Sequence, residues 1–143
     1  MKITKEITFD SAHMLSNYDG KCNNLHGHTY KLQVTLEGEI NKKTHMLMDF
    51  NALKDALNES VMKVFDHAII FSGADVREES ENELLKWAIA YKKRCFVLES
   101  GKTTCENMAP VICDRIRAYL GYGYKDIKVS VKLWETPTSF AEV

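Results

Sequence analysis

The chain has 143 residues, with 19 lysines and arginines against 20 aspartates and glutamates, a formal net charge of −1. This length and a hydrophobic content of 45% predict one globular domain spanning residues 1–143. The balanced charge argues against a nucleic-acid partner, and no apolar stretch reaches the roughly 20 residues that span a membrane. The polar, alternating start carries no signal-peptide pattern, so we expect a cytoplasmic protein whose four cysteines are reduced.

Two stretches near the start alternate between apolar and polar residues, as β-strands do. In residues 3–10 the apolar side chains occupy odd positions, and the same parity reaches His13. In residues 29–37 they occupy even positions, and this parity extends back to His28 and His26. Residues 46–48 are interpreted as a short strand extension.

Three helices are expected in the middle of the chain. Asp49 can cap the first, whose apolar stripe runs at spacings of three and four to residue 64. The second is predicted from about Ser80 to residue 93, with Ser80 and Glu83 forming a capping box. The third begins at a similar box, Thr103-x-x-Glu106, and Gly121 is placed to end it.

The remaining elements are strands, and together they suggest an α+β domain. Residues 127–133 alternate as a strand that Pro137 ends, and residues 95–98 and 140–143 are short strand candidates. Strands adjacent in sequence tend to pair antiparallel, which predicts a four-stranded antiparallel sheet with helices on one face. Such a sheet has two open edges, which favours oligomerisation through them.

Three histidines form a candidate metal site. The parity of their strands places His13, His26 and His28 on one sheet face if the two strands pair as a hairpin. Catalytic zinc sites often use three protein ligands and leave one position open. A lone HxH pair is more often chance than a ligand pair, but the matching strand-end histidine and a nearby cysteine favour the metal.

Cys22 is the strongest nucleophile or proton-transfer candidate among the four cysteines. It lies in a polar loop beside Lys21 and just before the expected metal strand, a setting that favours the thiolate. Cysteine is also a good zinc ligand, so Cys22 could instead complete a structural zinc site. Cys105, in the first turn of a helix, ranks second.

Two further features carry acid–base groups. Asp66 and His67 are adjacent, and a carboxylate beside an imidazole can orient it for proton transfer, although a capping Asp next to a surface His is the more common case. The strand parity points Glu135 to the apolar face, where its carboxylate needs donors. A ring that offers two N–H groups, such as an aminopyrimidinone, would supply them.

Together these motifs resemble one enzyme family over nearly the whole chain. The motifs are His13, Cys22-x-x-x-His26-Gly27-His28, Asp49-Phe50-x-x-Leu53-Lys54, Asp66-His67, Thr103-Thr104-x-Glu106-Asn107 and Trp134-Glu135-Thr136-Pro137. They resemble the 6-pyruvoyl-tetrahydropterin synthase family. The three-residue gap between Cys22 and His26 is similar to that of the branch that makes 6-carboxy-5,6,7,8-tetrahydropterin for queuosine, since the pyruvoyl-forming branch usually has a longer gap.

The resemblance implies a tunnelling fold (T-fold), in which trimers close their sheets into a barrel and two trimers stack into a homohexamer. It implies a Zn²⁺ cofactor held by His13, His26 and His28, and a neighbouring subunit that supplies part of the catalytic group. The implied site residues are catalytic Cys22, Asp66 and His67 and, around the pterin, Glu135, Thr103, Thr104 and Glu106.

The implied substrate is 7,8-dihydroneopterin triphosphate, which would lose acetaldehyde and triphosphate without a redox cofactor. The alternatives are the pyruvoyl-forming reaction, a catalytically silent pterin- or purine-binding T-fold protein, and a structural zinc module. The chain departs from the family pattern at Thr103, where many members have proline. The segment from about residue 75 to 99 is longer than expected and has no assigned role. Lys21, Lys31 and Lys102 are candidates for holding the triphosphate.

Overall fold

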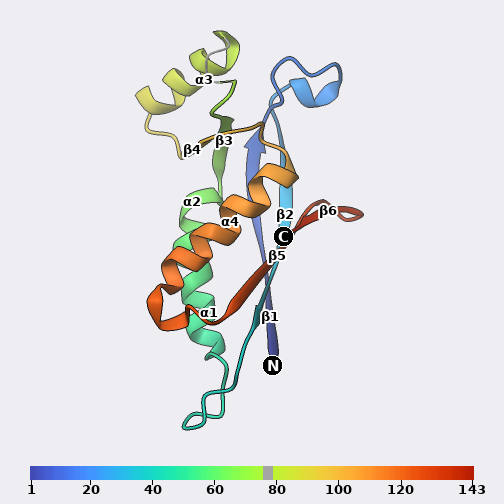
Figure 1. Ribbon diagram of the computed structural model, residues 1–143. Coiled ribbons are helices and arrows are strands. Elements are labelled where there is room, and N and C mark those ends of the chain that lie inside the picture. Colours follow the sequence, from blue (N-terminus) through green and yellow to red (C-terminus); the bar gives the residue numbers. More distant parts are fainter. Residues whose placement is uncertain (76–78) are drawn as a thin grey trace.

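The computed structural model describes residues 1–75 and 79–143, and its centre is one mixed β-sheet (Figure 1). The strands are β1 (Lys2–His13), β2 (His26–Glu37), β3 (Ala68–Ser72), β4 (Cys95–Leu98), β5 (Lys128–Thr136) and β6 (Ser139–Glu142). Their order across the sheet is β4-β3-β1-β2-β5-β6.

Helices occupy the connections between these strands. They are α1 (Phe50–Leu57), a π-helical turn (Asn58–Met62) that continues directly into α2 (Lys63–Phe65), α3 (Glu79–Ala90) and α4 (Cys105–Leu120). Two short 3₁₀ turns, Lys21–Asn23 and Tyr122–Tyr124, lie in loops.

The predicted α+β class is confirmed, but the prediction of a four-stranded antiparallel sheet is wrong. The sheet of the described residues has six strands, because β3 and β4 extend it beyond β1. Both added pairings, β3 with β1 and β4 with β3, are parallel. Parallel neighbours need a long crossover connection, and α3 lies in the connection between β3 and β4. The short apolar run that forms β3 directly follows the Asp66-His67 motif, and the sequence analysis assigned no element to it.

The hydrophobic core lies between one face of the sheet and the long helices. Figure 1 shows α1, α2 and α4 along this face, whereas α3 lies at the end of the sheet beside β4. Leu53 and Leu57 of α1 and Ile112 and Ile116 of α4 are fully buried against core strand residues such as Leu32. The prediction of helices on one face therefore holds for α1, α2 and α4.

Two of the predicted helix ends are confirmed. Asp49 caps α1 by accepting a hydrogen bond from the Asn51 amide at 2.7 Å. Gly121 ends α4 with a φ of 66°, a backbone conformation that glycine adopts without steric cost. The side chain of Ser80, on which the predicted capping box of α3 depends, lies outside the described residues.

Two local predictions are wrong. Residues 46–48 form no strand; instead Leu47 and Met48 are buried and close the core beside α1. The N-cap of α4 is Thr104 rather than Thr103, and its side chain makes no capping hydrogen bond. Thr103 is instead fully buried, and its hydroxyl donates to the Met14 carbonyl at 2.9 Å.

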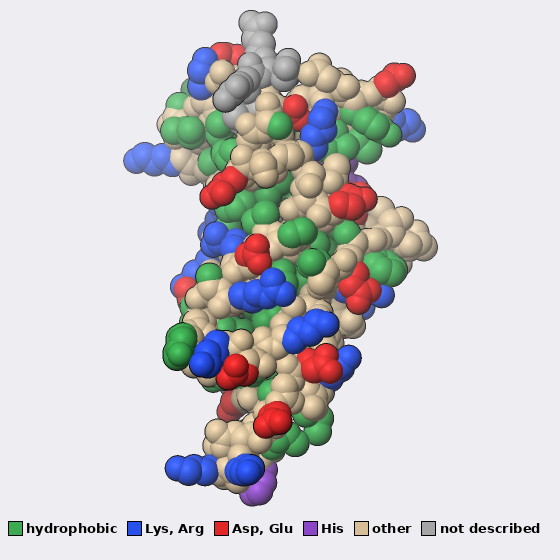
Figure 2. Space-filling model, in the orientation of Figure 1, with side chains coloured by type: hydrophobic (Ala, Val, Ile, Leu, Met, Phe, Trp, Pro, Cys, Tyr) green, Lys and Arg blue, Asp and Glu red, His purple; other side chains and the backbone are tan. Residues whose placement is uncertain are grey.

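The visible surface carries interspersed charges. Figure 2 shows acidic and basic side chains alternating over the face it draws, without a large area of one sign. No helix in the described part of the chain has both the length and the apolar content to cross a membrane.

Candidate active site

The three candidate metal ligands meet at one end of the β1–β2 hairpin. Antiparallel pairing places His13 opposite His26 and Ser11 opposite His28, so the three imidazoles project from the same face. One ring nitrogen of each lies within 4.8 Å of those of the other two. The predicted convergence of these histidines is confirmed.

The contacts of two rings orient them for metal binding. His13 Nδ1 donates to the Thr103 carbonyl at 2.7 Å, and His26 Nδ1 donates to the Asn24 carbonyl at 2.8 Å. In the neutral imidazoles these bonds leave Nε2 as the atom with the free lone pair. Both Nε2 atoms are buried and have no hydrogen-bond partner. Buried, unpartnered lone pairs that converge are the donor set expected of a metal site.

Burial also keeps the buried histidine neutral. Desolvation, aided by the neighbouring His26 and His28, lowers the pKa of His13 to about 4. Desolvation likewise lowers the pKa of His28, despite the opposing charge of Glu135. His13 and His28 are therefore favoured in the neutral form, which binds metal cations.

A cavity of about 180 Å³ lies beside the histidine cluster. Its lining brings together residues from four parts of the chain, among them His13, Cys22, Thr104, Cys105, Glu106 and Glu135. The cavity therefore combines one histidine of the cluster, two thiols and two carboxylates.

Cys22 reaches this cavity from the loop between β1 and β2. It lies in the 3₁₀ turn Lys21–Asn23 and is half-buried. Its carbonyl accepts a hydrogen bond from the Leu15 amide at 2.8 Å, which ties the turn to the end of β1. The loop thus places Cys22 in the same cavity lining as His13, while its thiol is not part of the three-histidine cluster.

Glu135 and Tyr30 place two further polar groups near the cluster. Glu135 Oε1 lies 3.7 Å from His13 Nε2 and 3.9 Å from His28 Nε2, too far for a hydrogen bond. The fully buried Tyr30 hydroxyl has no hydrogen-bond partner, and desolvation together with Glu135 and Cys105 raises its pKa strongly. Tyr30 was not predicted as a site residue, although it is the next residue after His28 whose side chain lies on the same face of the strand.

The N-terminus of α4 forms one wall of the cavity. Its lining residues are Thr104, Cys105 and Glu106. Thr103 is not among the lining residues, and its carbonyl accepts the hydrogen bond from His13. The Cys105 thiol donates to the Leu133 carbonyl at 3.0 Å, and burial raises its pKa to about 11. Cys105 is therefore a protonated lining group and a poor nucleophile.

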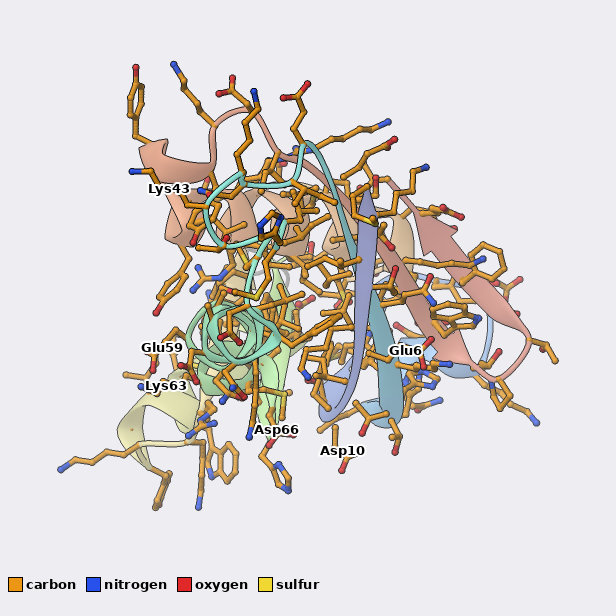
Figure 3. All side chains as sticks on the ribbon, turned by 90° about the horizontal axis from the view of Figure 1, so that it is seen from below. Glu6, Asp10, Lys43, Glu59, Lys63 and Asp66 are labelled. Carbon is orange, nitrogen blue, oxygen red and sulfur yellow. The ribbon has the colours of Figure 1, made fainter. Side chains whose placement is uncertain are left out.

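Asp66 and His67 form a close pair where α2 meets β3. Asp66 Oδ2 lies 3.0 Å from His67 Nδ1, and Oδ1 accepts from the Asp10 amide at 3.1 Å. Desolvation raises the pKa of Asp66, but the hydrogen bonds from Asp10 and His67 and the charge of Arg94 outweigh it, so the pKa is lowered. Figure 3 shows Asp10 and Asp66 on the same side of the molecule.

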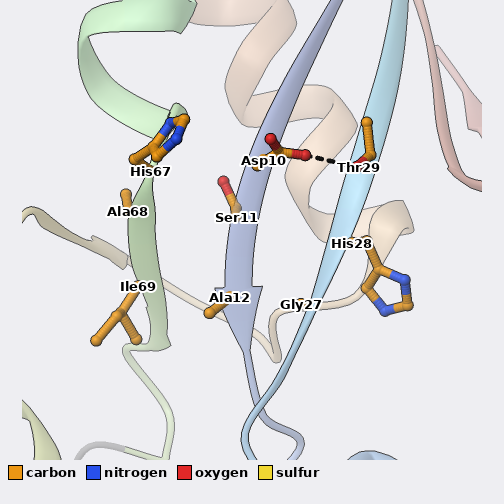
Figure 4. A pocket seen from close by; sticks show the side chains of 9 residues that line it. All are labelled: Asp10, Ser11, Ala12, Gly27, His28, Thr29, His67, Ala68 and Ile69. Carbon is orange, nitrogen blue, oxygen red and sulfur yellow. Dashed lines mark hydrogen bonds between the residues drawn. The ribbon is translucent and has the colours of Figure 1, made fainter.

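The Asp66–His67 pair lies apart from the histidine cluster of the same chain. His67 lines a second, open cavity of about 430 Å³, whose lining also includes Asp10, Thr29 and, from the cluster, His28. In Figure 4, β1 runs between His67 and His28, and the His28 ring points away from His67. The residues that line the 180 Å³ cavity include neither Asp66 nor His67.

Residues 2–143 match the protein family described as 6-pyruvoyl tetrahydropterin synthase. The chain belongs to this family. It is 40% identical over 144 residues to the 6-carboxy-5,6,7,8-tetrahydropterin synthase of Haemophilus influenzae, covering 99% of this chain and 96% of the relative. The protein of the same name from Rickettsia bellii is 29% identical over 143 residues, covering 100% and 99%.

Solved structures of the family share the fold. The 6-pyruvoyl tetrahydropterin synthase of Plasmodium falciparum superposes with a TM-score of 0.76 at 20% identity, covering 100% of this chain and 96% of that one. The Caenorhabditis elegans 6-pyruvoyl tetrahydropterin synthase gives 0.70 at 21% identity, covering 100% and 94%. The T-fold that the sequence motifs imply is therefore the fold of this family member.

Two of the three lysines predicted as candidates for holding the triphosphate interact with other residues of the chain. Lys31 pairs with Glu6 at 3.0 Å on the polar face of the sheet. Lys102 donates to the Ser16 carbonyl and lies 3.6 Å from Asp75. Lys21 is exposed beside Cys22.

Proposed function

We propose that the chain is a zinc-dependent 6-carboxy-5,6,7,8-tetrahydropterin synthase. It would convert 7,8-dihydroneopterin triphosphate and water into 6-carboxy-5,6,7,8-tetrahydropterin, acetaldehyde and triphosphate. The observation that carries the proposal is the set of converging, unpartnered imidazole nitrogens beside a cavity that also holds Cys22 and Glu135. The names of the full-length relatives support this substrate and product.

His13, His26 and His28 would hold the zinc ion. When bound there, the metal would supply Lewis acidity, which lowers the pKa of a substrate hydroxyl and polarises a carbonyl during C–C cleavage. The protein's own contribution is to orient the rings: the carbonyls of Thr103 and Asn24 fix two of them through Nδ1.

Glu135 would bind the pterin ring. Its half-buried carboxylate faces the cavity, and no residue that the structure describes donates a hydrogen bond to it. A 2-amino-4-oxo ring offers two adjacent N–H groups, which would pair with the two carboxylate oxygens. Thr104 and Glu106 line the same cavity and would contact the bound ring.

Cys22 would transfer protons at the substrate side chain, since Cys105, the other thiol of the cavity, is held protonated by burial. Asp66 and His67 would complete this group. Because they lie apart from the cavity of their own chain, they would come from a neighbouring subunit of a homohexamer. The open sheet edges at β4 and β6 are consistent with such an assembly.

The test is to incubate the zinc-loaded protein with 7,8-dihydroneopterin triphosphate and to identify the products by mass spectrometry. The expected result is 6-carboxytetrahydropterin together with acetaldehyde. A 6-pyruvoyl product would contradict the proposal, as would binding of the substrate without turnover. Cys22→Ala protein, processed in parallel, controls for non-enzymatic decay.

A further inference from the structure

A buried carboxylate outside the cavity carries a further inference. Glu81, on α3, is fully buried, and both of its oxygens are used. Oε2 accepts from the Ser16 hydroxyl at 2.6 Å, and Oε1 accepts from the Ser72 amide at 2.8 Å. The helix that carries it belongs to the long segment to which the sequence analysis gave no role.

The first contact leads to the loop that carries Cys22. Ser16 is buried directly after Leu15, whose amide donates to the Cys22 carbonyl at 2.8 Å. The hydrogen bond that Ser16 donates to Glu81 therefore fixes the residue next to Leu15. Leu15 in turn holds the backbone of the Cys22 turn.

The second contact leads to the residues before α4. Besides donating its amide to Glu81, Ser72 donates its hydroxyl to the Gly101 carbonyl at 2.9 Å. Two residues later, the Thr103 carbonyl accepts from His13 Nδ1. The Glu81 carboxylate thus connects two segments that form walls of the cavity, namely the Cys22 loop and the start of α4.

In the part of the chain that the structure describes, no cation compensates the burial of Glu81. Lys102 pairs with Asp75 instead, and no ion pair among the described residues includes Glu81. Placing a carboxylate among neutral donors costs free energy unless its hydrogen bonds are well formed. A serine hydroxyl and a backbone amide at 2.6 and 2.8 Å satisfy that requirement and hold their two segments at a fixed separation.

We propose that Glu81 is a positioning residue that sets the distance between the Cys22 loop and the start of α4. Its effect on turnover rests on the proposed function, but its effect on the Cys22 loop does not. Through Ser16 it holds the thiol beside the metal ligands, and through Ser72 it holds the segment whose carbonyl orients His13.

Four variants separate this role from a general contribution to stability. Glu81→Ala removes both hydrogen bonds, and Ser16→Ala removes only the one to the Cys22 loop. Glu81→Gln keeps both contacts, since its amide oxygen can accept from Ser72 and its NH₂ can donate to Ser16 Oγ. Glu83→Ala is the matched control, because Glu83 is exposed on the same helix and pairs only with Lys86.

The first readout is the rate at which iodoacetamide alkylates Cys22, followed by peptide mass spectrometry. We expect Glu81→Ala and Ser16→Ala to raise this rate by about threefold or more, because the released loop opens more often. Glu81→Gln and Glu83→Ala should match the wild type. If Glu81→Ala lowers the melting temperature but leaves the Cys22 rate unchanged, the role is merely structural and the inference is wrong.

The second readout is kinetic. In Glu81→Ala and Ser16→Ala, kcat should fall by about tenfold or more with a smaller change in KM, because a misplaced thiol impairs chemistry more than binding. Glu81→Gln should restore kcat; equal loss in Glu81→Gln and Glu81→Ala would show that the charge matters rather than the contacts, which overturns the proposal. Should Glu81→Ala fail to fold, Ser16→Ala alone decides by the same criteria.

The two proposals fail separately. If the wild type does not turn over dihydroneopterin triphosphate, the proposed function is wrong, yet the alkylation rates still test Glu81. If turnover occurs and all variants keep the wild-type Cys22 rate, only the positioning role is wrong.

Discussion

His13 Nδ1 donates to the Thr103 carbonyl at 2.7 Å, although 90 residues separate them. His13 is the last residue of β1, and Thr103 directly precedes the N-cap of α4. The contact makes the segment before a distant helix the element that orients a buried imidazole of the histidine cluster. Because it occupies Nδ1, it fixes Nε2 as the nitrogen that faces the other two histidines.

The histidine cluster predicts the metal content of the protein. We expect His13→Ala to lower bound zinc per chain by about tenfold or more, because two imidazoles form an incomplete site. His45→Asn is the control, since His45 is exposed and asparagine tolerates its φ of 56°. Zinc is measured by inductively coupled plasma mass spectrometry after dialysis. Equal zinc in both variants would contradict the three-histidine site.

The position of Cys22 predicts that metal binding and turnover can be separated. Cys22→Ala should keep one zinc per chain and lose about 10²–10⁴-fold in kcat, the usual contribution of a general acid or base. Cys95→Ala, at the outer strand β4, should change neither quantity. If zinc is lost along with activity, Cys22 is a structural ligand and the protein a zinc module.

The sequence predicted those parts of the fold that depend on local periodicity. The alternation in β1 and β2 placed three histidines on one face, and their pairing in a hairpin followed from short separation along the chain. The strand β3 was missed because four of its five residues, Ala68–Phe71, form an apolar run without alternation. Parallel strands that are buried on both faces commonly have such continuous apolar sequences. Periodicity alone does not distinguish them from a buried helical segment.

Contacts between distant segments could not be predicted. The Thr103-x-x-Glu106 pattern indicated a capping box, yet tertiary contacts use the Thr103 hydroxyl and carbonyl for Met14 and His13. Likewise, nothing in the local sequence distinguishes the buried Glu81 from the exposed Glu83. Their difference depends on where α3 places Glu81, within hydrogen-bond distance of Ser16 and Ser72.

Glu135 should contribute to substrate binding rather than to metal binding. Glu135→Gln should raise the dissociation constant of a pterin ligand by about tenfold or more, since each hydrogen bond to a charged group contributes about 1.5–3 kcal/mol. Zinc content should stay at the wild-type level. Glu142→Gln is the control, because Glu142 is exposed on β6 and contacts Lys132. Isothermal titration with neopterin measures the constants, and loss of zinc in Glu135→Gln would make Glu135 a ligand.

The separation of Cys22 from His67 within one chain predicts complementation between subunits. Cys22→Ala and His67→Asn chains should each be inactive alone. After they are unfolded together and refolded at equal amounts, about a quarter of the sites should combine an intact Cys22 with a neighbour's intact His67. Activity should therefore return to that fraction of the wild-type value. Mixtures that stay inactive, although mixed oligomers are seen by native mass spectrometry, would place both residues in one chain's site.

The hydrogen bonds at Asp66 predict a pH-dependent contribution to stability. Although desolvation raises the pKa of Asp66, the contacts with Asp10, His67 and Arg94 lower it below its ordinary value in the folded state. A carboxyl with a lowered folded pKa stabilises the protein above its unfolded pKa of about 3.9, and this contribution is lost as pH falls through the folded value. Wild type should therefore exceed Asp66→Asn in free energy of unfolding at pH 6, and the difference should shrink toward pH 3.

Urea titrations at several pH values measure this difference, and introducing His67→Asn into both proteins should reduce its pH dependence. A difference that stays constant between pH 6 and pH 3 would refute the assignment.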